Sequence, residues 1–475
     1  MREQEISDLI RFIDADPIIC DAARTAEELT FPLFLVGGWV RDRLIGILSR
    51  DYDFIVQGDV KGFAGRLSGK WGASFFVMGR RDPPNYRIAG PDYTVDMAPQ
   101  VPEGLEQELS RRDFTINTMA FSFGDREFLD PLGGGSDLSD RLVRMVSPAV
   151  LDADPIRMLR AVRLTTVLEG FQLEPSTASE IRRHPDRLSQ SAAERVREEM
   201  DRIMVSGRAP QGLSLMQDLG LLQVVCPELL TLSGLDQGSY HHLDAFGHTL
   251  ETVREVHGLF DTVPGEPKDR PFRFAFKMDP EDRIVLAYAA LLHDIGKAQS
   301  RTLDSEGIPH FYGHEKIGAV MAGEVMKRLC FSNSRADRVE RLIRFHVLGL
   351  GLIHAGYTEK ALRRIIHKLG EDLPLHVLLS LSDRRAARGR NFHEMEKKNI
   401  MIGQALLDMY TEEGERLLRP ANLVSGREIM EILDLAPGPA VGEVVEKVRM
   451  LQIDRVIQSR EEALSFLRSL RKDRY

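Results

Sequence analysis

The sequence predicts an α+β fold in which a mixed sheet with helices comes first and an all-α region follows. Short runs of strand-forming residues, separated by glycine-rich turns, fill the first 150 residues. After residue 150 the apolar residues recur at helical spacing, as in Ile156, Leu159 and Val162. The chain shows no internal repeat. These observations favour a strand-containing head followed by a long helical body.

The expected strands lie in short segments rich in aromatic and β-branched residues, which are FLVGG, YDFIV, ASFFVMG, YTVDMA and REFLD. Turn-forming residues near 226–238 and 263–279 interrupt the helical pattern that follows the head. From Asp282 onward almost the whole chain reads as helix.

The chain has 475 residues, which is too long for a single hydrophobic core, so three or four domains are expected. The change of pattern predicts a head over residues 1–148 and a helical neck over residues 149–232. We expect a third domain over residues 233–400 and a helical C-terminal tail domain over residues 401–475.

Composition excludes several classes of protein. With 43% hydrophobic and 28% charged residues, the chain is neither disordered nor collagen-like. Its longest apolar run, Ile284–Leu292, is far shorter than the roughly 20 residues that span a membrane. Three distant cysteines and an N-terminus without a signal peptide predict a cytoplasmic protein. The net charge of −9 does not favour nucleic acid, but residues 141–208 are rich in arginine and lack lysine, which suits contacts with phosphates and bases.

The first candidate site is the segment LVGGWVRDRLIG and the DYDFIV that follows it. Because alternate side chains of a strand share a face, Asp51 and Asp53 are expected to point the same way. Two neighbouring carboxylates repel each other unless a cation lies between them, and oxygen ligands suit Mg²⁺. The backbone amides of Gly37 and Gly38 could cradle a phosphate, and Arg41 follows within reach.

Two further segments of the head carry charged residues. Asp96 closes the strand TVDMA, where it could complete a two-metal cluster or simply cap a turn. In SRRDFTINTMAF, Arg112 could neutralise a triphosphate. Asp113 is placed as a helix N-cap, and it could also accept a hydrogen bond from a ribose hydroxyl.

The ordered blocks GGWVRD…DYD, RRDFTIN, DPLGGGSDL and DPIRMLRAVRL resemble the class II tRNA nucleotidyltransferase and bacterial poly(A) polymerase family. This resemblance implies a DNA polymerase beta-like head, a helical neck and template-independent addition of nucleotides to an RNA 3′ end. It implies that Asp51 and Asp53 hold Mg²⁺, and that Gly38, Arg41 and Arg112 contact the nucleotide. The expected partners are tRNA or another RNA 3′ end together with CTP, ATP or both, with neither DNA nor a membrane involved.

The block DADPIRMLRAVRL resembles the helix with which this family reads the incoming base, which assigns Asp154 and Arg157 to its Watson–Crick edge. Residues three apart are neighbours on one helix face. Asp154 before Pro155 is equally suited to cap a helix. Arg160 and Arg163 continue the spacing and are further candidates for nucleotide binding, but each step turns by about 60°. Arg163 is therefore expected opposite Asp154, where it is less suited to bind the nucleotide.

The chain departs from the family pattern in two places. Ala153 replaces an acidic residue before Asp154, and only fifteen residues separate Asp96 from Arg112. Within the family, a short segment between the residues that correspond to Asp96 and Arg112 is typical of the CC-adding enzymes. The resemblance therefore favours CC addition over full CCA addition. An A-adding enzyme or a poly(A) polymerase is the alternative. SAAERVREEM, over Ser191–Met200, resembles a family motif that joins neck and head, for which a structural role is expected.

A second constellation lies in the helical body, in the segments LLHDIGK, YGHE, RFHV and LSDRR. Imidazoles with a carboxylate bind transition metals and leave positions open for water and a phosphate ester. The pattern resembles the HD phosphohydrolase family and implies a divalent transition metal and phosphatase or cyclic phosphodiesterase activity. Two alternatives remain open: a vestigial HD domain, and an HD hydrolase whose head only holds RNA. The implied metal ligands are His248, His293, Asp294, His314, His346 and Asp383.

Overall fold

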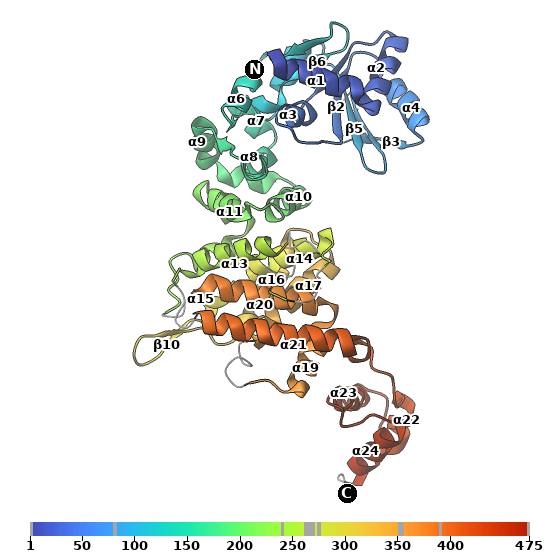
Figure 1. Ribbon diagram of the computed structural model, residues 1–475, viewed down its shortest axis with the longest axis vertical. Helices are drawn as coiled ribbons and strands as arrows, with labels where there is room; N and C mark the ends of the chain where they lie inside the picture. Colours follow the sequence, from blue (N-terminus) through green and yellow to red (C-terminus); the bar gives the residue numbers. More distant parts are fainter. Residues whose placement is uncertain are drawn as a thin grey trace. The chain divides into compact units, whose positions relative to one another are not determined.

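The computed structural model describes residues 3–78, 83–238, 242–260, 271–272, 277–349, 356–388 and 392–472. The chain divides into two compact units (Figure 1). The first comprises Met1–Ile203 and Ser214–Val225, and the second comprises Met204–Leu213 and Cys226–Tyr475. The finer division into head, neck, HD domain and tail stays a prediction.

A seven-stranded mixed sheet forms the centre of the first unit, in the order β3-β4-β5-β2-β1-β6-β7. Strands β2 and β5 are parallel, whereas the other neighbours in this sheet are antiparallel. The strands are β1 (Leu33–Val36), β2 (Asp51–Val56), β3 (Ser74–Met78), β4 (Asn85–Ala89), β5 (Thr94–Pro99), β6 (Ala120–Ser122) and β7 (Glu127–Leu129).

All five segments expected as strands contribute one, which confirms the α+β prediction for the head. Strands β4 and β6 were not expected. The β4 segment NYRIA carries Asn and Arg among its five residues, and β6 has only three residues, all of them buried. β4 lacks the continuous apolar run, and β6 lacks the length, on which a strand prediction depends.

Helices and short strands make up the rest of the first unit and the segments at its boundary. The helices are α1 (Glu3–Ala15), α2 (Pro17–Leu29), α3 (Gly38–Leu44), α4 (Val60–Trp71), α5 (Leu105–Ser110), η1 (Thr115–Asn117), α6 (Gly134–Ser139), α7 (Pro148–Ala153), α8 (Ile156–Val167), α9 (Pro175–Arg183), η2 (Pro185–Gln190), α10 (Ala193–Met204), α11 (Ala209–Asp218) and α12 (Leu221–Val225). Strands β8 (Leu142–Val143) and β9 (Gln172–Leu173) form a small parallel pair.

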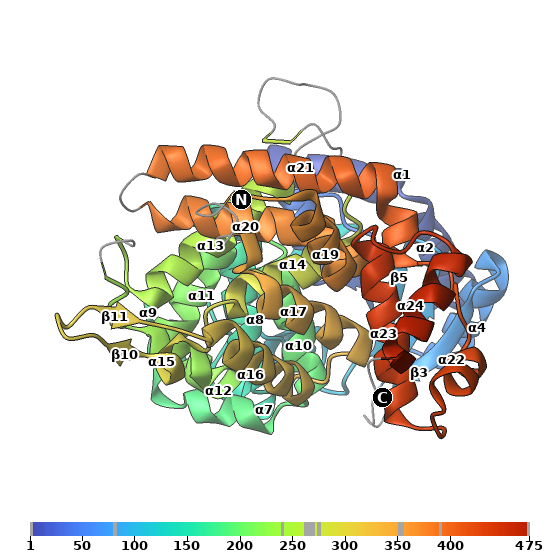
Figure 2. The same cartoon turned by 90° about the horizontal axis from the view of Figure 1, so that it is seen from below.

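Among the described residues of the second unit, the regular elements are helices apart from the hairpin of β10 (Thr302–Leu303) and β11 (Pro309–His310). Helices α20 and α21 run side by side in both views (Figures 1 and 2). The helices are η3 (Pro227–Leu232), α13 (Ala245–Phe260), α14 (Pro280–Leu292), α15 (Lys297–Ser300), α16 (His314–Arg328), α17 (Asn333–Phe345), α19 (Glu359–Leu369), η4 (Gly370–Asp372), α20 (Leu373–Ala387) and α21 (Phe392–Leu418), followed by α22 (Gly426–Leu433), α23 (Pro439–Ile453) and α24 (Arg460–Lys472).

Helix α14 is the buried centre of this unit. Every residue from Val285 to Leu292 is buried, and α13, α17 and α20 pack around the helix. The longest apolar run of the sequence is therefore a core helix. Within the described part of the chain, no helix combines the length and apolarity that crossing a membrane requires. The last three helices enclose a smaller core of their own, which includes Ile429, Ala463 and Leu467.

Candidate nucleotide and metal sites

The turn between β1 and α3 brings the backbone close to Asp53. β1 ends at Val36, which lies opposite Asp53 in the antiparallel register, and Gly37 follows with φ +81°. A Cβ atom at Gly37 would lie 2.4 Å from Oδ2 of Asp53 and 2.5 Å from Nη1 of Arg112. Glycine is therefore required here for its positive φ and for the space that it leaves.

Strand β2 places its two carboxylates as the alternation predicts. Tyr52 faces inward, where its ring stacks on Trp39 and its hydroxyl donates to Asp16 at 2.9 Å. Asp51 and Asp53 face the other way, and both line the same cavity. Asp51 accepts a hydrogen bond from Thr94, and Asp53 lies 3.5 Å from Nη1 of Arg112. Asp53 therefore lies against the diglycine turn, and Asp51 lines the same cavity as Gly38.

The charge of Asp53 fits a cation at this place. Desolvation in the cavity raises the pKa of Asp53 and the nearby Asp96 charge adds to this, so the single guanidinium of Arg112 offsets them only in part. A divalent cation beside Asp51 and Asp53 would supply the missing positive charge, and their oxygen ligands suit Mg²⁺.

Asp96 is engaged elsewhere. It lies beside Asp53 in the parallel register of β2 and β5, but both of its oxygens accept hydrogen bonds from Arg87 at 2.6 Å. Asp96 is not among the residues that line the cavity. Its role as a metal ligand stays a prediction.

The cavity beside these carboxylates has a volume of about 520 Å³ and a surplus of positive charge. Six arginines and four aspartates are among the described residues that line it, so the site suits a polyanion. The arginines come from the head and from the helices after it. The charged residues of the lining are Arg41, Arg112, Arg157, Arg160, Arg163, Arg202, Asp42, Asp51, Asp53 and Asp113.

A chain of hydrogen bonds joins the diglycine turn to helix α8. Arg41 binds the neighbouring Asp42 and donates to Oδ1 of Asn117 at 2.6 Å. Asn117 in turn donates to Asp113 at 2.8 Å, and Arg160 of α8 donates to the other Asp113 oxygen at 3.0 Å. Burial alone would raise the pKa of Asp113, but Arg160, Asn117 and the Phe114 amide together hold it below the usual value.

Asp113 is not a helix N-cap, so that prediction is wrong. The short helix η1 begins two residues later, and Phe114 occupies its cap position. The acidic side chain is instead buried between three donors, which makes it a link between the head and the next helices.

Helix α8 presents Arg157, Arg160 and Arg163 to one cavity. Arg160 also bonds to Glu199 of α10 at 3.1 Å, and Arg163 bonds to the other Glu199 oxygen at 2.5 Å. Arg163 therefore lines the same cavity as Arg157 and Arg160, and its role in binding the nucleotide stays a prediction. Arginine side chains are long, so residues that step around the helix still reach the same space.

Asp154 and Arg157 do not share a helix face, contrary to the prediction. Asp154 follows α7 in an extended conformation, and both of its oxygens accept hydrogen bonds from Arg195 at 2.9 and 2.8 Å. Arg157 lies inside α8 and donates to the Val150 carbonyl at 3.2 Å. Its buried Nε has no hydrogen-bond partner among the described residues, and desolvation lowers its pKa. Arg157 therefore has donor capacity for a ligand.

Sequence reasoning missed four residues of this site, which are Asp42, Asn117, Glu199 and Arg202. Asn117 is the last residue of the block RRDFTIN, and Glu199 belongs to SAAERVREEM. Both motifs were recognised, but the partners of these two residues lie far along the chain.

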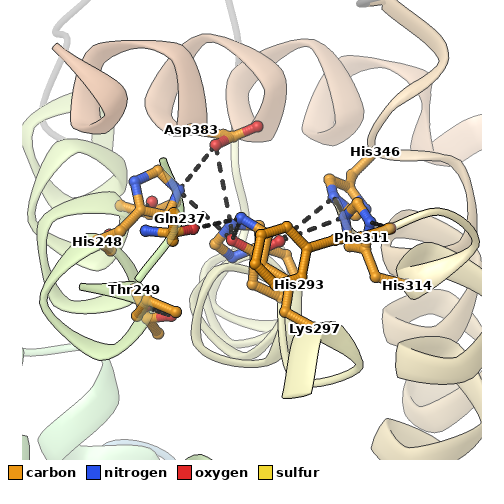
Figure 3. Close-up of polar contacts among 12 residues, drawn as sticks. Gln237, His248, Thr249, His293, Lys297, Phe311, His314, His346 and Asp383 are labelled. Carbon is orange, nitrogen blue, oxygen red and sulfur yellow. Dashed lines mark hydrogen bonds and ion pairs between the residues drawn. The ribbon is translucent and has the colours of Figure 1, made fainter. Parts of the chain in front are cut away.

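The second site gathers all six implied ligands of the helical unit (Figure 3). His248 comes from α13, His293 and Asp294 follow α14, and Asp383 comes from α20. Nε2 of His248 lies 3.0 Å from Asp383, and Nε2 of His293 lies 3.1 Å from Asp294. On the other side of Asp294, Nε2 of His314 lies 3.4 Å from Oδ1, and His346 lies 3.9 Å from the same atom.

The histidines are oriented by their own backbone. Nδ1 of His293 lies 2.9 Å from the Ala290 carbonyl, and His314 and His346 contact the carbonyls three residues before them in the same way. When Nδ1 carries the proton and donates it to the carbonyl, the lone pair of Nε2 is available to a metal ion between these side chains. This is the usual arrangement of metal-binding imidazoles. Burial lowers the pKa of His248 and takes that of His346 to about 3, so both stay neutral and able to bind a metal.

Asp294 belongs to two groups whose ligand atoms all lie within 4.8 Å of one another. One group comprises His248, His293 and Asp294, and the other comprises Asp294, His314 and His346. Lys297 binds Asp294 at 2.6 Å and Gln237 at 2.5 Å. Burial opposes the charge of Asp294, but His293 and Lys297 lower its pKa well below the usual value. The residues fit a transition metal, with Asp294 able to serve two ions.

Comparison with known proteins agrees with this geometry. Residues 33–144 match the poly A polymerase head domain, residues 170–232 match a probable RNA and SrmB-binding site of polymerase A, and residues 245–388 match the HD domain. An A-adding tRNA nucleotidyltransferase of Deinococcus radiodurans is 34% identical over 91% of this chain and 94% of its own length. A CC-adding tRNA nucleotidyltransferase of Thermus thermophilus is 35% identical over 91% of this chain and 92% of its own length.

The fold is also that of solved structures. A CCA-adding enzyme in complex with ATP matches with a TM-score of 0.62 over 98% of both chains, at 19% identity. The fold and the two sites define a nucleotidyltransferase head followed by an HD domain. The chain belongs to the tRNA nucleotidyltransferase and bacterial poly(A) polymerase family, as its motifs predicted.

Gly37→Ala tests the close approach at the turn. We expect the affinity for a Mg²⁺–nucleoside triphosphate to fall by at least roughly tenfold, because the added methyl group displaces Asp53 and Arg112. Isothermal titration calorimetry measures this. Gly46→Ala is the matched control, since Gly46 has a similar φ of +78° and a Cβ atom there would have no other atom within 4 Å. Equal affinities of the two variants would contradict the steric argument.

Glu199→Ala tests the ion pairs between α8 and α10. We expect the free energy of unfolding to fall by about 3–5 kcal/mol, because Arg163 loses its carboxylate partner and Arg160 keeps only its bond to Asp113. Both tryptophans, Trp39 and Trp71, lie in the first unit, so denaturation followed by tryptophan fluorescence reports on that unit alone.

Asp14→Ala is the control for this measurement. It removes the exposed ion pair of Asp14 with Arg126, which is expected to contribute less than about 1 kcal/mol. A loss at Glu199 as small as the loss at Asp14 would show that the pairs on α8 do not hold the unit together.

Proposed function

We propose that this protein adds nucleotides to the 3′ end of tRNA without a template, and that CC addition is its reaction. The observation that carries the first part is the cavity in which Asp51 and Asp53 face six arginines. Its relatives named A-adding, CC-adding and multifunctional CCA proteins support tRNA as the acceptor.

In the proposed reaction the 3′-hydroxyl oxygen of the RNA attacks the α-phosphorus of the incoming nucleotide. The new O–P bond forms as the bond to the β-phosphate breaks, so pyrophosphate leaves and the hydroxyl proton passes to solvent. Mg²⁺ bound to Asp51 and Asp53 would stabilise the charge of the reacting phosphate. Arg41 and Arg112 would hold the triphosphate beside the diglycine turn, so that catalysis depends mainly on positioning.

Arg157 and Asp154 would recognise the base. Arg157 has a buried donor without a partner among the described residues, and a forked guanidinium matches the acceptors of cytosine or adenine. Asp154 can accept from a base amino group only when Arg195 releases at least one of its oxygens. Arg160 and Arg163 are held by Glu199, so they would contribute positive charge to the cavity more than base contacts.

The preference for CC addition rests on the short segment between Asp96 and Arg112. It contains the end of β5, a turn and the two-turn helix α5 (Leu105–Ser110), which leaves little chain for a long movable loop. An A-adding enzyme is the alternative, since a relative with that name is equally similar.

Product sequencing distinguishes these reactions. A tRNA that lacks its CCA end is incubated with Mg²⁺, CTP and ATP, and the 3′ ends are sequenced. We expect products that end in CC, because the chain lacks the longer segment found in enzymes that continue to A. A tRNA that already ends in CC serves as the second substrate. Addition of A to it would favour the alternative, and a long A tract would favour a poly(A) polymerase.

A second activity is proposed for the HD site. Six buried or half-buried ligands with oriented imidazoles support a metal-dependent phosphohydrolase. A transition metal bound there would activate water toward a phosphate ester. Lys297 would help to hold Asp294 charged and in place.

Two substitutions separate the activities. Asp53→Asn is expected to lower nucleotide transfer by at least about a hundredfold and leave phosphatase activity unchanged, because it weakens charge stabilisation only in the head. Asp294→Asn is expected to abolish phosphatase activity and to reduce bound transition metal, because both ligand groups include this carboxylate. Transfer assays, phosphate release and metal analysis provide the readouts. If Asp53→Asn left transfer intact, the assignment of the head would be wrong.

A further inference from the structure

A row of side chains crosses four strands of the head on the face that carries Asp53. In the register of the sheet, Phe76 of β3 lies opposite Arg87 of β4, and Arg87 lies opposite Asp96 of β5. Asp96 in turn lies beside Asp53 of β2. Residues that are partners across neighbouring strands point to the same face of a sheet. Because neighbouring strands are about 4.8 Å apart, the backbones of Arg87 and Phe76 lie about 10 and about 14 Å from that of Asp53.

The opposite face of β3 and β4 packs against helix α4. Tyr86 is buried, and its ring contacts the ring of Phe75. A Cβ atom at Gly65 of α4 would lie 3.8 Å from the Phe75 ring. Since side chains alternate along a strand, Phe76 and Arg87 point away from α4. Phe76 is 49% exposed and the side chain of Arg87 is 34% exposed, so both are open to a ligand on the Asp53 face.

Arg87 is held in a fixed orientation and keeps free donors. Its Nε and Nη2 donate to the two oxygens of Asp96, each at 2.6 Å. Nη1 has no hydrogen-bond partner within the part of the chain that the structure describes. A guanidinium group has five N–H donors in one plane, so Nη1 can donate to a phosphate while the pair with Asp96 stays intact. Because Asp96 offsets the charge of Arg87, such a contact depends on this hydrogen bond more than on net charge.

The geometry of phosphoryl transfer directs the acceptor RNA to this side of Asp53. Gly37 follows the β1 residue that lies opposite Asp53, so the diglycine turn is on the other side of β2 from β5 and β4. In the proposed reaction that turn holds the triphosphate, and pyrophosphate leaves there. The attacking and leaving oxygens lie roughly in line through the phosphorus. The 3′-hydroxyl therefore approaches from the side of β5 and β4, where Arg87 and Phe76 lie.

We propose that Arg87 and Phe76 position the 3′ end of the acceptor RNA. Arg87 donates to a phosphate near the end, and Phe76 stacks on one of its bases. Aromatic rings beside cationic phosphate contacts are the means by which proteins bind single strands, and stacking tolerates any base. This inference rests on the proposed nucleotide transfer and deepens it, because it assigns residues that bind the acceptor and not the incoming nucleotide.

The test measures KM for a tRNA that lacks its CCA end and KM for CTP, with the full-length protein and Mg²⁺. Phe76→Ala and Arg87→Gln are each expected to raise KM for the tRNA about tenfold. KM for CTP is expected to stay unchanged, because neither residue lines the nucleotide cavity. Phe76→Tyr keeps the ring and is expected to behave as the wild type.

Two matched controls lie on the opposite side of the sheet. Val77→Ala removes an exposed apolar side chain from the other face of the same strand. Arg66→Gln removes an exposed arginine of α4. Neither is expected to change KM for the tRNA or for CTP.

A second comparison distinguishes contact with RNA from a structural role. If Arg87 only neutralised Asp96, the double variant Arg87→Gln with Asp96→Asn would return KM for the tRNA to the wild-type value. That result would overturn the inference. A KM that stays raised in the double variant supports a direct contact between Arg87 and the RNA.

A wild-type KM for the tRNA in Phe76→Ala or in Arg87→Gln would also overturn the inference, and nucleotide transfer would still stand. If the wild type added no nucleotide to any tRNA tested, the proposed transfer would fail instead. Binding of a tRNA with 2-aminopurine at its 3′ end, followed by quenching of its fluorescence, then decides the inference. Weaker quenching with Phe76→Ala than with the wild type supports stacking, and equal quenching overturns it.

Discussion

The hydrogen-bonded chain from Arg41 through Asn117 and Asp113 to Arg160 is the interaction on which the nucleotide site depends. It continues to Glu199, which also holds Arg163. Burying a charge without a partner costs several kcal/mol, so each residue in this series of hydrogen bonds requires the residues to which it is bonded. Pairing of this kind adds little net stability, but it fixes side chains to within a narrow range. Residues from four segments of the sequence thereby converge at one cavity, and phosphate chemistry that depends on positioning requires this.

Local rules predicted the parts of the site that depend on neighbours in sequence. Strand alternation placed Asp51 and Asp53 on one face, and the diglycine indicated the close approach that Gly37 makes. The order of histidines and aspartates identified the HD centre, although the orientation of each imidazole through its Nδ1 needed the structure. Asn117 and Glu199 were missed because Arg41 lies 76 positions from Asn117, and Arg160 and Arg163 lie 39 and 36 positions from Glu199. Periodicity contains no information about such pairs.

The error at Asp154 has a local cause. A residue before proline is disfavoured in the helical region, and Asp154 has the extended angles φ −150° and ψ 91°. The prediction counted the three-residue spacing from Asp154 to Arg157 as if both lay in one helix. The helix is broken between α7 and α8, so Asp154 lies outside α8 and Arg157 lies within it. The pairing with Arg195 follows from this, because an extended residue outside α8 can turn its carboxylate toward α10. The same break leaves Arg157 near the start of α8, facing the cavity.

The geometry of the HD centre argues against a vestigial role. Asp294 and His293 are almost completely buried, and Nε2 of His293 lies 3.1 Å from the Asp294 carboxylate. Well-packed apolar residues in the place of buried charges are often neutral or stabilising, so this cluster does not serve the stability of the helical unit. Three imidazoles nevertheless keep a backbone acceptor for Nδ1 and direct Nε2 inward. A structural core does not require that common orientation, whereas a metal site does, and this favours a bound metal over a remnant that only supports the fold.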